Sequence, residues 1–160
     1  MSVLSRRVPV GAKAPDFSLL NSEGAYVTLS GLSKNGCVLL VFLRGFGCPF
    51  CRRHLRQLAS QSQAFAGVGV QVIVMAHDSP QKAKAYFEAH QIPFPCLIDS
   101  EHSVYDMYQV ESRPESLGQR PAEFLVDMEG VVRYAHIGWQ QWEIPGAREV
   151  LEICSSINCK

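Results

Sequence analysis

The sequence has no excess of charge of either sign. Fifteen lysines and arginines balance fifteen aspartates and glutamates, and the charged residues form no long run of one sign. Proteins that bind nucleic acid or anionic membranes through a charged surface usually carry such an excess. We therefore expect no nucleic-acid partner.

The sequence also lacks long hydrophobic runs. No segment approaches the roughly 20 apolar residues of a transmembrane helix, and the opening "MSVLSRRVPVGAKAPDF" has two arginines without the apolar stretch of a signal peptide. Repeats and low-complexity tracts are absent, while 47% of the residues are hydrophobic, enough for a core. We expect one domain over residues 1–160, no membrane partner and a cytoplasmic location.

Six cysteines are present, but the chain is too large and too apolar to need a disulfide framework. Cys37 and Cys96 lie in or beside apolar segments, where a free cysteine behaves as a small hydrophobic residue. We expect both to be buried and inert. Cys154 and Cys159 are left as distant thiols that could resolve an oxidised cysteine.

Apolar periodicity predicts strands that alternate with helices. The expected strands are 25–30, 37–43, 70–76, 95–100 and the two halves of an antiparallel hairpin at 122–138; the expected helices are 49–65, 80–90, 101–110 and 145–157. Ser79 is the expected N-cap of the second helix, and the turn of the hairpin is expected at residues 127–130. This order predicts an α/β fold with a mixed central sheet flanked by helices.

The segment "FLRGFGCPFCRRHLRQL" carries the most informative motif. Cys48 falls at the N-cap of the helix expected at 49–65, Pro49 at its first position and Cys51 in its first turn. Unpaired N–H groups and the helix dipole stabilise a thiolate there and lower the pKa of a cysteine below about 8.5. Positions three apart have Cα atoms about 5 to 6 Å apart, which suits a disulfide. We expect a redox-active pair.

Two further features bear on this pair. Four arginines flank it and could add positive potential, although exposed charges contribute little: Arg44, Arg52, Arg53 and Arg56. The pair could instead be half of a zinc site completed by His54, Cys154 or Cys159. The strand-to-helix position of the pair and the absence of a second C-x-x-C motif argue against zinc.

A buried strand that leads into Cys-Pro-Phe-Cys and a helix, followed by "RPAEFLVDMEGVVRYAHIG", resembles the thioredoxin superfamily. The segments "VGAKAPDFSLLNSEGAYVTLS" and "IPFPCLIDSEHSVYDMYQV" are similar to its peroxiredoxin-like branch, the alkyl hydroperoxide reductase and thiol-specific antioxidant group. The likeness runs from about Val8 to Ile153. It implies a thioredoxin-like fold with a peroxiredoxin-like N-terminal extension.

The resemblance leaves the roles of the two cysteines open. Peroxiredoxins place their attacking cysteine in a Pro-x-x-x-Thr/Ser-x-x-Cys pattern, and in that register Arg44 replaces the proline, Cys48 replaces the hydroxyl residue and Cys51 is the attacking cysteine. In the thioredoxin register Cys48 attacks and Cys51 resolves. An N-cap side chain projects from the helix mouth, whereas a first-turn residue is more covered, and this favours Cys48 as the nucleophile.

The resemblance also singles out residues before the hairpin. Pro121 resembles the cis-proline of the superfamily, whose backbone lies against the active-site sulfurs, and Arg120 is a candidate for the arginine that fixes a peroxide. Trp139 and Trp142 follow the hairpin. We expect them to pack between the sheet and the last helix, with a place in a substrate groove as the alternative.

Three functions are compatible with these residues. The first is reduction of peroxides by a dithiol that becomes a disulfide and is reset by an external thiol reductant, such as a thioredoxin or glutaredoxin system. The second is thiol-disulfide exchange with protein disulfides. The third is a non-catalytic module that binds zinc or senses oxidation. We expect no cofactor and no metal, and a homodimer as one assembly state.

Overall fold

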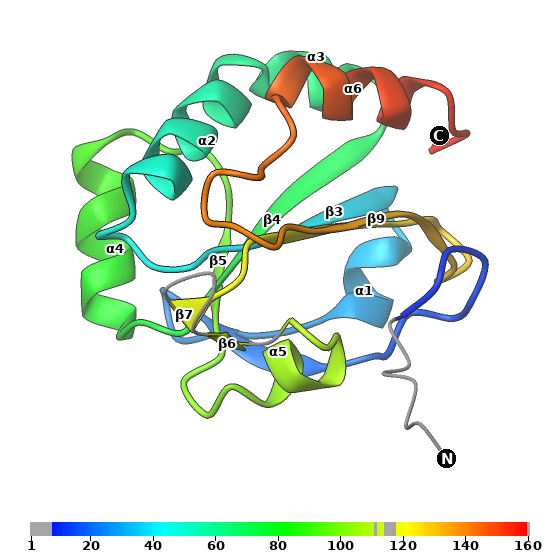
Figure 1. Ribbon diagram of the computed structural model, residues 1–160. Coiled ribbons are helices and arrows are strands. Elements are labelled where there is room, and N and C mark those ends of the chain that lie inside the picture. Colours follow the sequence, from blue (N-terminus) through cyan, green and yellow to red (C-terminus); the bar gives the residue numbers. More distant parts are fainter. Residues whose placement is uncertain (1–7, 111, 114–117, 160) are drawn as a thin grey trace.

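A seven-stranded mixed sheet forms the centre of the computed structural model, which describes residues 8–110, 112–113 and 118–159 (Figure 1). The strand order is β2-β1-β5-β4-β3-β8-β9. The middle strand, β3 (Cys37–Phe42), pairs in parallel with β4 (Val70–Ala76) and antiparallel with β8 (Ala122–Val126). The expected α/β fold with a mixed sheet is confirmed.

Strand β3 is buried on both faces because every residue in it is apolar. Leu39 and Val41 face one core, while Leu40 and Phe42 face the other. Alternate residues of a strand point to opposite faces, so an unbroken apolar run fits only a strand that is covered on both sides. This places the following loop, which carries the cysteine pair, on the most enclosed strand of the sheet.

Helices cover both faces of the sheet (Figure 1). One face carries α2 (Pro49–Ser60), α3 (Ser62–Gly67), α4 (Pro80–Ala89) and α6 (Ala147–Ser155); the other carries α1 (Leu29–Ser33) and α5 (Ser103–Met107). The remaining strands are β1 (Ser18–Asn21), β2 (Tyr26–Thr28), β5 (Cys96–Ile98), β9 (Val132–Ile137) and the small pair β6 (Ser112–Arg113) and β7 (Gly118–Gln119).

The structure confirms the expected hairpin of β8 and β9 and the cap of α4, where the Ser79 hydroxyl accepts a hydrogen bond from the N–H of Lys82. The helix expected at 49–65 is instead two helices. Gln61, between α2 and α3, leaves helical geometry at φ −107° and ψ 13°. The break redirects the chain, and Phe65 is buried in the same core as Leu58.

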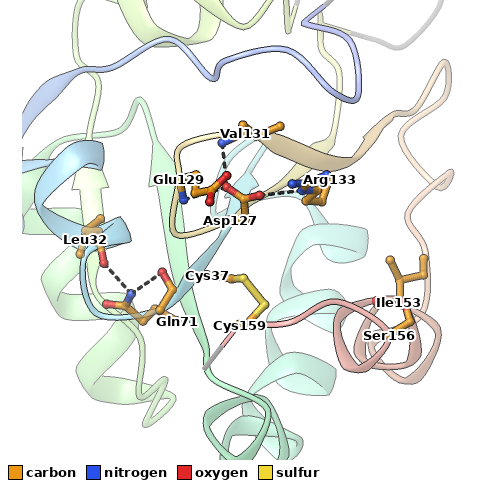
Figure 2. Close-up of a disulfide and its surroundings, with 11 residues drawn as sticks. Leu32, Cys37, Gln71, Asp127, Glu129, Val131, Arg133, Ile153, Ser156 and Cys159 are labelled. Atoms are coloured by element: carbon orange, nitrogen blue, oxygen red, sulfur yellow. Dashed lines mark hydrogen bonds and ion pairs between the residues drawn. A yellow bond between two sulfur atoms is a disulfide. The ribbon is translucent and has the colours of Figure 1, made fainter.

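The prediction that Cys37 is an inert thiol was wrong. Its sulfur forms a disulfide with Cys159, 122 residues away in the chain, as Figure 2 shows. After α6 the chain returns to the start of β3, where Gly36 lets the chain pass close to Gly69, because a Cβ at position 36 would lie 2.6 Å from the Gly69 carbonyl oxygen. Packing of distant segments creates the pair, and local sequence carries no trace of it. Cys96 and Cys154 are free and buried.

Candidate redox site

The cysteine pair lies where β3 passes into α2. Cys48 is the N-cap of α2 and Pro49 its first residue, as expected. Cys48 is 9% exposed and Cys51 is 1% exposed, so the N-cap sulfur is the more accessible of the two. The hydroxyl of Tyr105 holds the preceding loop, because it lies 2.8 Å from the carbonyl oxygens of Leu43 and Met75.

Cys48 is held as a thiolate. A hydrogen bond from the Cys51 thiol is the main reason that the pKa of Cys48 falls to about 5; the N–H of Cys51, the Arg44 guanidinium and the N–H of Phe50 lower it further, against burial. These donors favour the anion, as expected at a helix N-terminus. At neutral pH the Cys48 sulfur is therefore ready to attack an electrophile.

Cys51 behaves in the opposite way. Its hydrogen bond to Cys48 raises its pKa far above the usual range, and burial raises it further. The backbone N–H of Arg44 lies 3.3 Å from its sulfur. One proton is thus kept between the two sulfurs, and it belongs to Cys51.

Arg44 is the arginine that reaches the pair. Its Nη1 lies 3.2 Å from Cys48 Sγ and 2.8 Å from Gln141 Oε1, and its Nε donates to the carbonyl oxygen of Gln119 at 2.5 Å. The Arg52 side chain instead donates to the carbonyl oxygen of Phe46 and lies over the ring of Tyr86. Arg53 and Arg56 are exposed. Of the four arginines, Arg44 makes the contact with the thiolate.

Pro121 lies beside the pair, but the cis peptide expected there is not found. The described residues contain no cis peptide bond, so the bond from Arg120 to Pro121 is trans. The carbonyl oxygen of Pro121 accepts a hydrogen bond from Gly138 N–H at 2.9 Å, which carries the β8–β9 ladder beyond Ala122. An extended, strand-like path fits the trans isomer, which is the common one. Pro121 lines a small cavity together with Cys51.

Arg120 is almost fully buried, at 1% exposure. Its Nε donates to the carbonyl oxygen of Gly138 at 2.7 Å, and its guanidinium carbon lies 4.4 Å from the centre of the Trp139 ring. These contacts hold the chain that follows β9. A role for Arg120 in binding peroxide stays a prediction.

A buried pair that the sequence did not predict lies one helical turn from Cys51. His54 Nε2 and Glu123 Oε1 form a close hydrogen bond, and the two side chains are 5% and 2% exposed. His54 follows Cys51 by three positions on α2, and Glu123 interrupts the otherwise apolar strand β8. A charged residue inside an apolar strand pattern was the available sign that Glu123 has a special partner.

An open groove lies along α2 on the side of His54. Phe50, Trp142 and Ile144 line it with Arg53, His54 and Gln57, and its volume is about 250 Å³. Trp142 is 57% exposed, and its ring centre lies 6.4 Å from that of Phe50. The expectation that Trp139 and Trp142 are packed under the last helix was wrong, because both are largely exposed.

The described part of the chain holds no group of three or more His, Cys, Asp or Glu side chains placed to bind a metal ion. Within the same residues, no helix combines the length and the apolar character needed to cross a bilayer.

Comparison with known proteins adds a family match. The model of the AhpC/TSA family matches residues 10–135. Peroxiredoxin Bcp of Bacillus subtilis (strain 168) is 29% identical over 128 residues, which cover 77% of this chain and 81% of that protein. The thiol-disulfide oxidoreductase ResA of the same organism is also 29% identical, over 76% of this chain but only 64% of that protein.

Solved structures show the same fold. PrxQ of Xylella fastidiosa superimposes with a TM-score of 0.85 at 19% identity and covers 95% of this chain and 98% of that one. Peroxidoxin BcpB of Mycobacterium tuberculosis gives a TM-score of 0.81 at 21% identity and covers 94% of this chain and 99% of that one. The thioredoxin-like fold expected from the resemblance is confirmed.

Proposed function

The chain belongs to the AhpC/TSA family and is a thiol-dependent enzyme of the peroxiredoxin kind, and we propose that Cys48 is the thiolate that attacks a peroxide and Cys51 the thiol that resolves it. The opposed pKa values of the two sulfurs are the observation that carries the proposal: about 5 for Cys48, and far above the usual range for Cys51. A thiolate is the nucleophile, whereas a protonated thiol is not.

The reaction follows from these protonation states. The Cys48 thiolate attacks one oxygen of the peroxide bond, the O–O bond breaks, and the departing alkoxide or hydroxide takes up a proton from solvent. Cys48 becomes a sulfenic acid. Cys51 then loses its proton and attacks the Cys48 sulfur; the S–S bond forms, the S–O bond breaks, and the hydroxyl group leaves as water with a proton. An external dithiol reduces the resulting disulfide and is itself oxidised.

Arg44 supports the assignment of Cys48. In the family register a proline precedes the pair at this position, whereas here a guanidinium contacts the Cys48 sulfur. A cation beside the sulfur stabilises the thiolate and the negative charge that passes to the departing oxygen. We further propose that Pro121 shapes the wall next to Cys51 and that Arg120 holds the loop that carries Trp139.

Single serine variants test the assignment. Hydrogen peroxide should convert the Cys51→Ser variant to a stable sulfenic acid at Cys48, which dimedone traps and mass spectrometry locates. The Cys48→Ser variant should form no sulfenic acid at a comparable rate. Cys96→Ser is the matched control, because that thiol is free and buried away from the pair. Trapping at Cys51 in Cys48→Ser, at the rate of the unchanged protein, would reverse the roles.

Thiol-disulfide exchange with proteins is the second candidate function. The groove lined by Phe50 and Trp142 favours it, because Phe50 follows Cys48 by two residues and an aromatic wall so placed suits a polypeptide substrate. The similarity to ResA points the same way. Rapid reduction of insulin disulfides with slow turnover of peroxide would select this function.

The physiological reductant, assembly and compartment are further proposals. We propose a thioredoxin or glutaredoxin system as reductant, a homodimer, and the cytoplasm. The Cys37–Cys159 disulfide bears on the compartment, since structural disulfides are rare in a reducing cytosol. Acid-quenched alkylation of cells would show the state of this bond. A bond fully oxidised in growing cells would favour an oxidising compartment instead.

A further inference from the structure

The buried pair of His54 and Glu123 takes no part in the attack of Cys48 on peroxide. Both side chains are nearly inaccessible, and the Oε2 atom of Glu123 has no hydrogen-bond partner. A buried polar atom without a partner is unusual and costs free energy, so it calls for an explanation, and catalysis is one of the recognised explanations.

The sheet register points Glu123 toward the redox helix. Glu123 stands opposite Val41 of β3 and opposite His136 of β9. Directly opposed residues of antiparallel strands share a face, and Val41 belongs to the core that contains Cys51. The carboxylate therefore lies under α2, on the side of the buried sulfur.

Cys51, His54 and Glu123 line one cavity between β3, β8 and α2, with Pro121 at its wall. Its volume is about 10 Å³, close to the space that one water molecule occupies. A proton can cross such a space directly or through one water.

The Cys51 thiol must give up its proton at a site that solvent hardly reaches. Cys51 is 1% exposed, and its thiol must become a thiolate to attack oxidised Cys48. We propose that the His54–Glu123 pair accepts the Cys51 proton as Cys51 attacks the Cys48 sulfenic acid, and returns a proton to Cys51 when the disulfide is reduced. This inference rests on the proposed function.

The proton balance of the step is complete. The Cys51 S–H bond breaks and the proton passes to the unpartnered oxygen of Glu123 or to the neutral imidazole of His54 that is hydrogen-bonded to Glu123. The new bond joins the two sulfurs, and the S–O bond of Cys48 breaks. Hydroxide leaves and becomes water with a solvent proton, so that no oxidant beyond the peroxide already consumed is needed.

Other ionisable groups lie around the pair, and His136 lines the same cavity. His136 on β9 stands opposite Glu123, and its Nε2 donates to the carbonyl oxygen of Glu143 at 2.9 Å. Arg53 on α2 lines a groove with His54, and the Glu123 charge acts on Tyr134 of β9 and Cys154 of α6. Burial and the Glu123 charge raise the pKa of Cys154 to about 12 and raise the pKa of Tyr134 above its usual range. Neither side chain can take up a proton, because both already hold one.

Rapid mixing of reduced protein with hydrogen peroxide tests the proposal, because it separates sulfenic acid formation from disulfide formation. In Glu123→Gln the first step should keep its rate, while the second slows by about 100-fold or more and Cys48 sulfenic acid accumulates. The rate of disulfide formation should rise about tenfold per pH unit in the variant, and less steeply in the unchanged protein. His54→Gln should act in the same direction, and Glu123→Asp should restore part of the rate.

Glu152→Gln on the exposed side of α6 is the matched control and should change neither step. Disulfide formation in Glu123→Gln with unaltered rate and pH slope would overturn the proposal, as would equal slowing of both steps. If neither variant folds, the unchanged protein alone still tests the proposal. A tenfold rise per pH unit in its rate of disulfide formation between about pH 5 and pH 8 would overturn the proposal. If peroxide left the protein reduced, the proposed function would be refuted instead. The proton-transfer role of the His54–Glu123 pair could still be tested, because dithiothreitol should reduce the Cys48–Cys51 disulfide more slowly in Glu123→Gln than in the unchanged protein.

Discussion

The hydrogen bond from the Cys51 thiol is the largest cause of the low pKa of Cys48. Its removal by Cys51→Ala should therefore raise the pKa of Cys48. A hydrogen bond to a charged group is worth about 1.5–3 kcal/mol, and about 1.4 kcal/mol corresponds to one pKa unit. The pKa should move from about 5 to about 6–7.

Cys51→Ser provides the contrast, because the serine hydroxyl can still donate a hydrogen bond. Its Cys48 pKa should stay close to about 5. Arg44→Gln removes one cationic donor at 3.2 Å and should raise the pKa by about one unit, since the site is partly open to solvent.

The rate of alkylation by iodoacetamide as a function of pH measures this pKa. The signal comes from Cys48, because burial raises the pKa of both Cys96 and Cys154 to about 12, and Cys37 and Cys159 are bonded to each other. Equal pKa values in Cys51→Ala and Cys51→Ser would refute the reasoning, since the thiol donor would then contribute nothing.

The redox potential of the pair, the Cys37–Cys159 disulfide and the Tyr105 hydrogen bond can each be tested. The reduction potential of the pair should fall by about 59 mV per pH unit below pH 5, where reduction takes up two protons, and by about 30 mV above it, where Cys48 stays a thiolate; redox titration across pH would contradict this with one unbroken slope. Cys159→Ser should lower the free energy of unfolding by about 2–4 kcal/mol and leave peroxide turnover intact; urea unfolding measures it, and an unchanged midpoint would mean that the bond does not form. Tyr105→Phe should cost about 1–3 kcal/mol, because the carbonyl oxygen of Leu43 loses its buried donor; thermal unfolding checks it, with exposed Tyr26→Phe as a control that should change nothing.

The sequence carried most of the fold because the elements that matter are locally encoded. The unbroken apolar run of β3 and the Ser79-Pro80 start of α4 each depend on neighbouring residues alone. The break at Gln61 was missed, because nothing in its own residue type opposes helix and packing decides it. One thioredoxin-like domain over residues 1–160 stays a prediction.

The site was predicted only in part, because only some of its features are encoded by neighbouring residues. The N-cap position of Cys48 is a local property, and the sequence placed it correctly. The contact of Arg44 with the sulfur depends on its anchoring to Gln119 and Gln141, which are far along the chain. The partnership of His54 with Glu123 and that of Cys37 with Cys159 likewise arise when distant segments pack, so periodicity and spacing could not reveal them.

The two sulfurs share one helical turn, and this has a consequence for motion. On the proposed roles, closing the disulfide needs side-chain rotation within the first turn of α2, and no segment has to travel toward Cys48. Amide hydrogen exchange in α2 should then be equally slow in the dithiol and disulfide forms. Such an enzyme should keep cycling when its backbone is immobilised, for example when it is tethered to a solid support or embedded in a glassy sugar matrix.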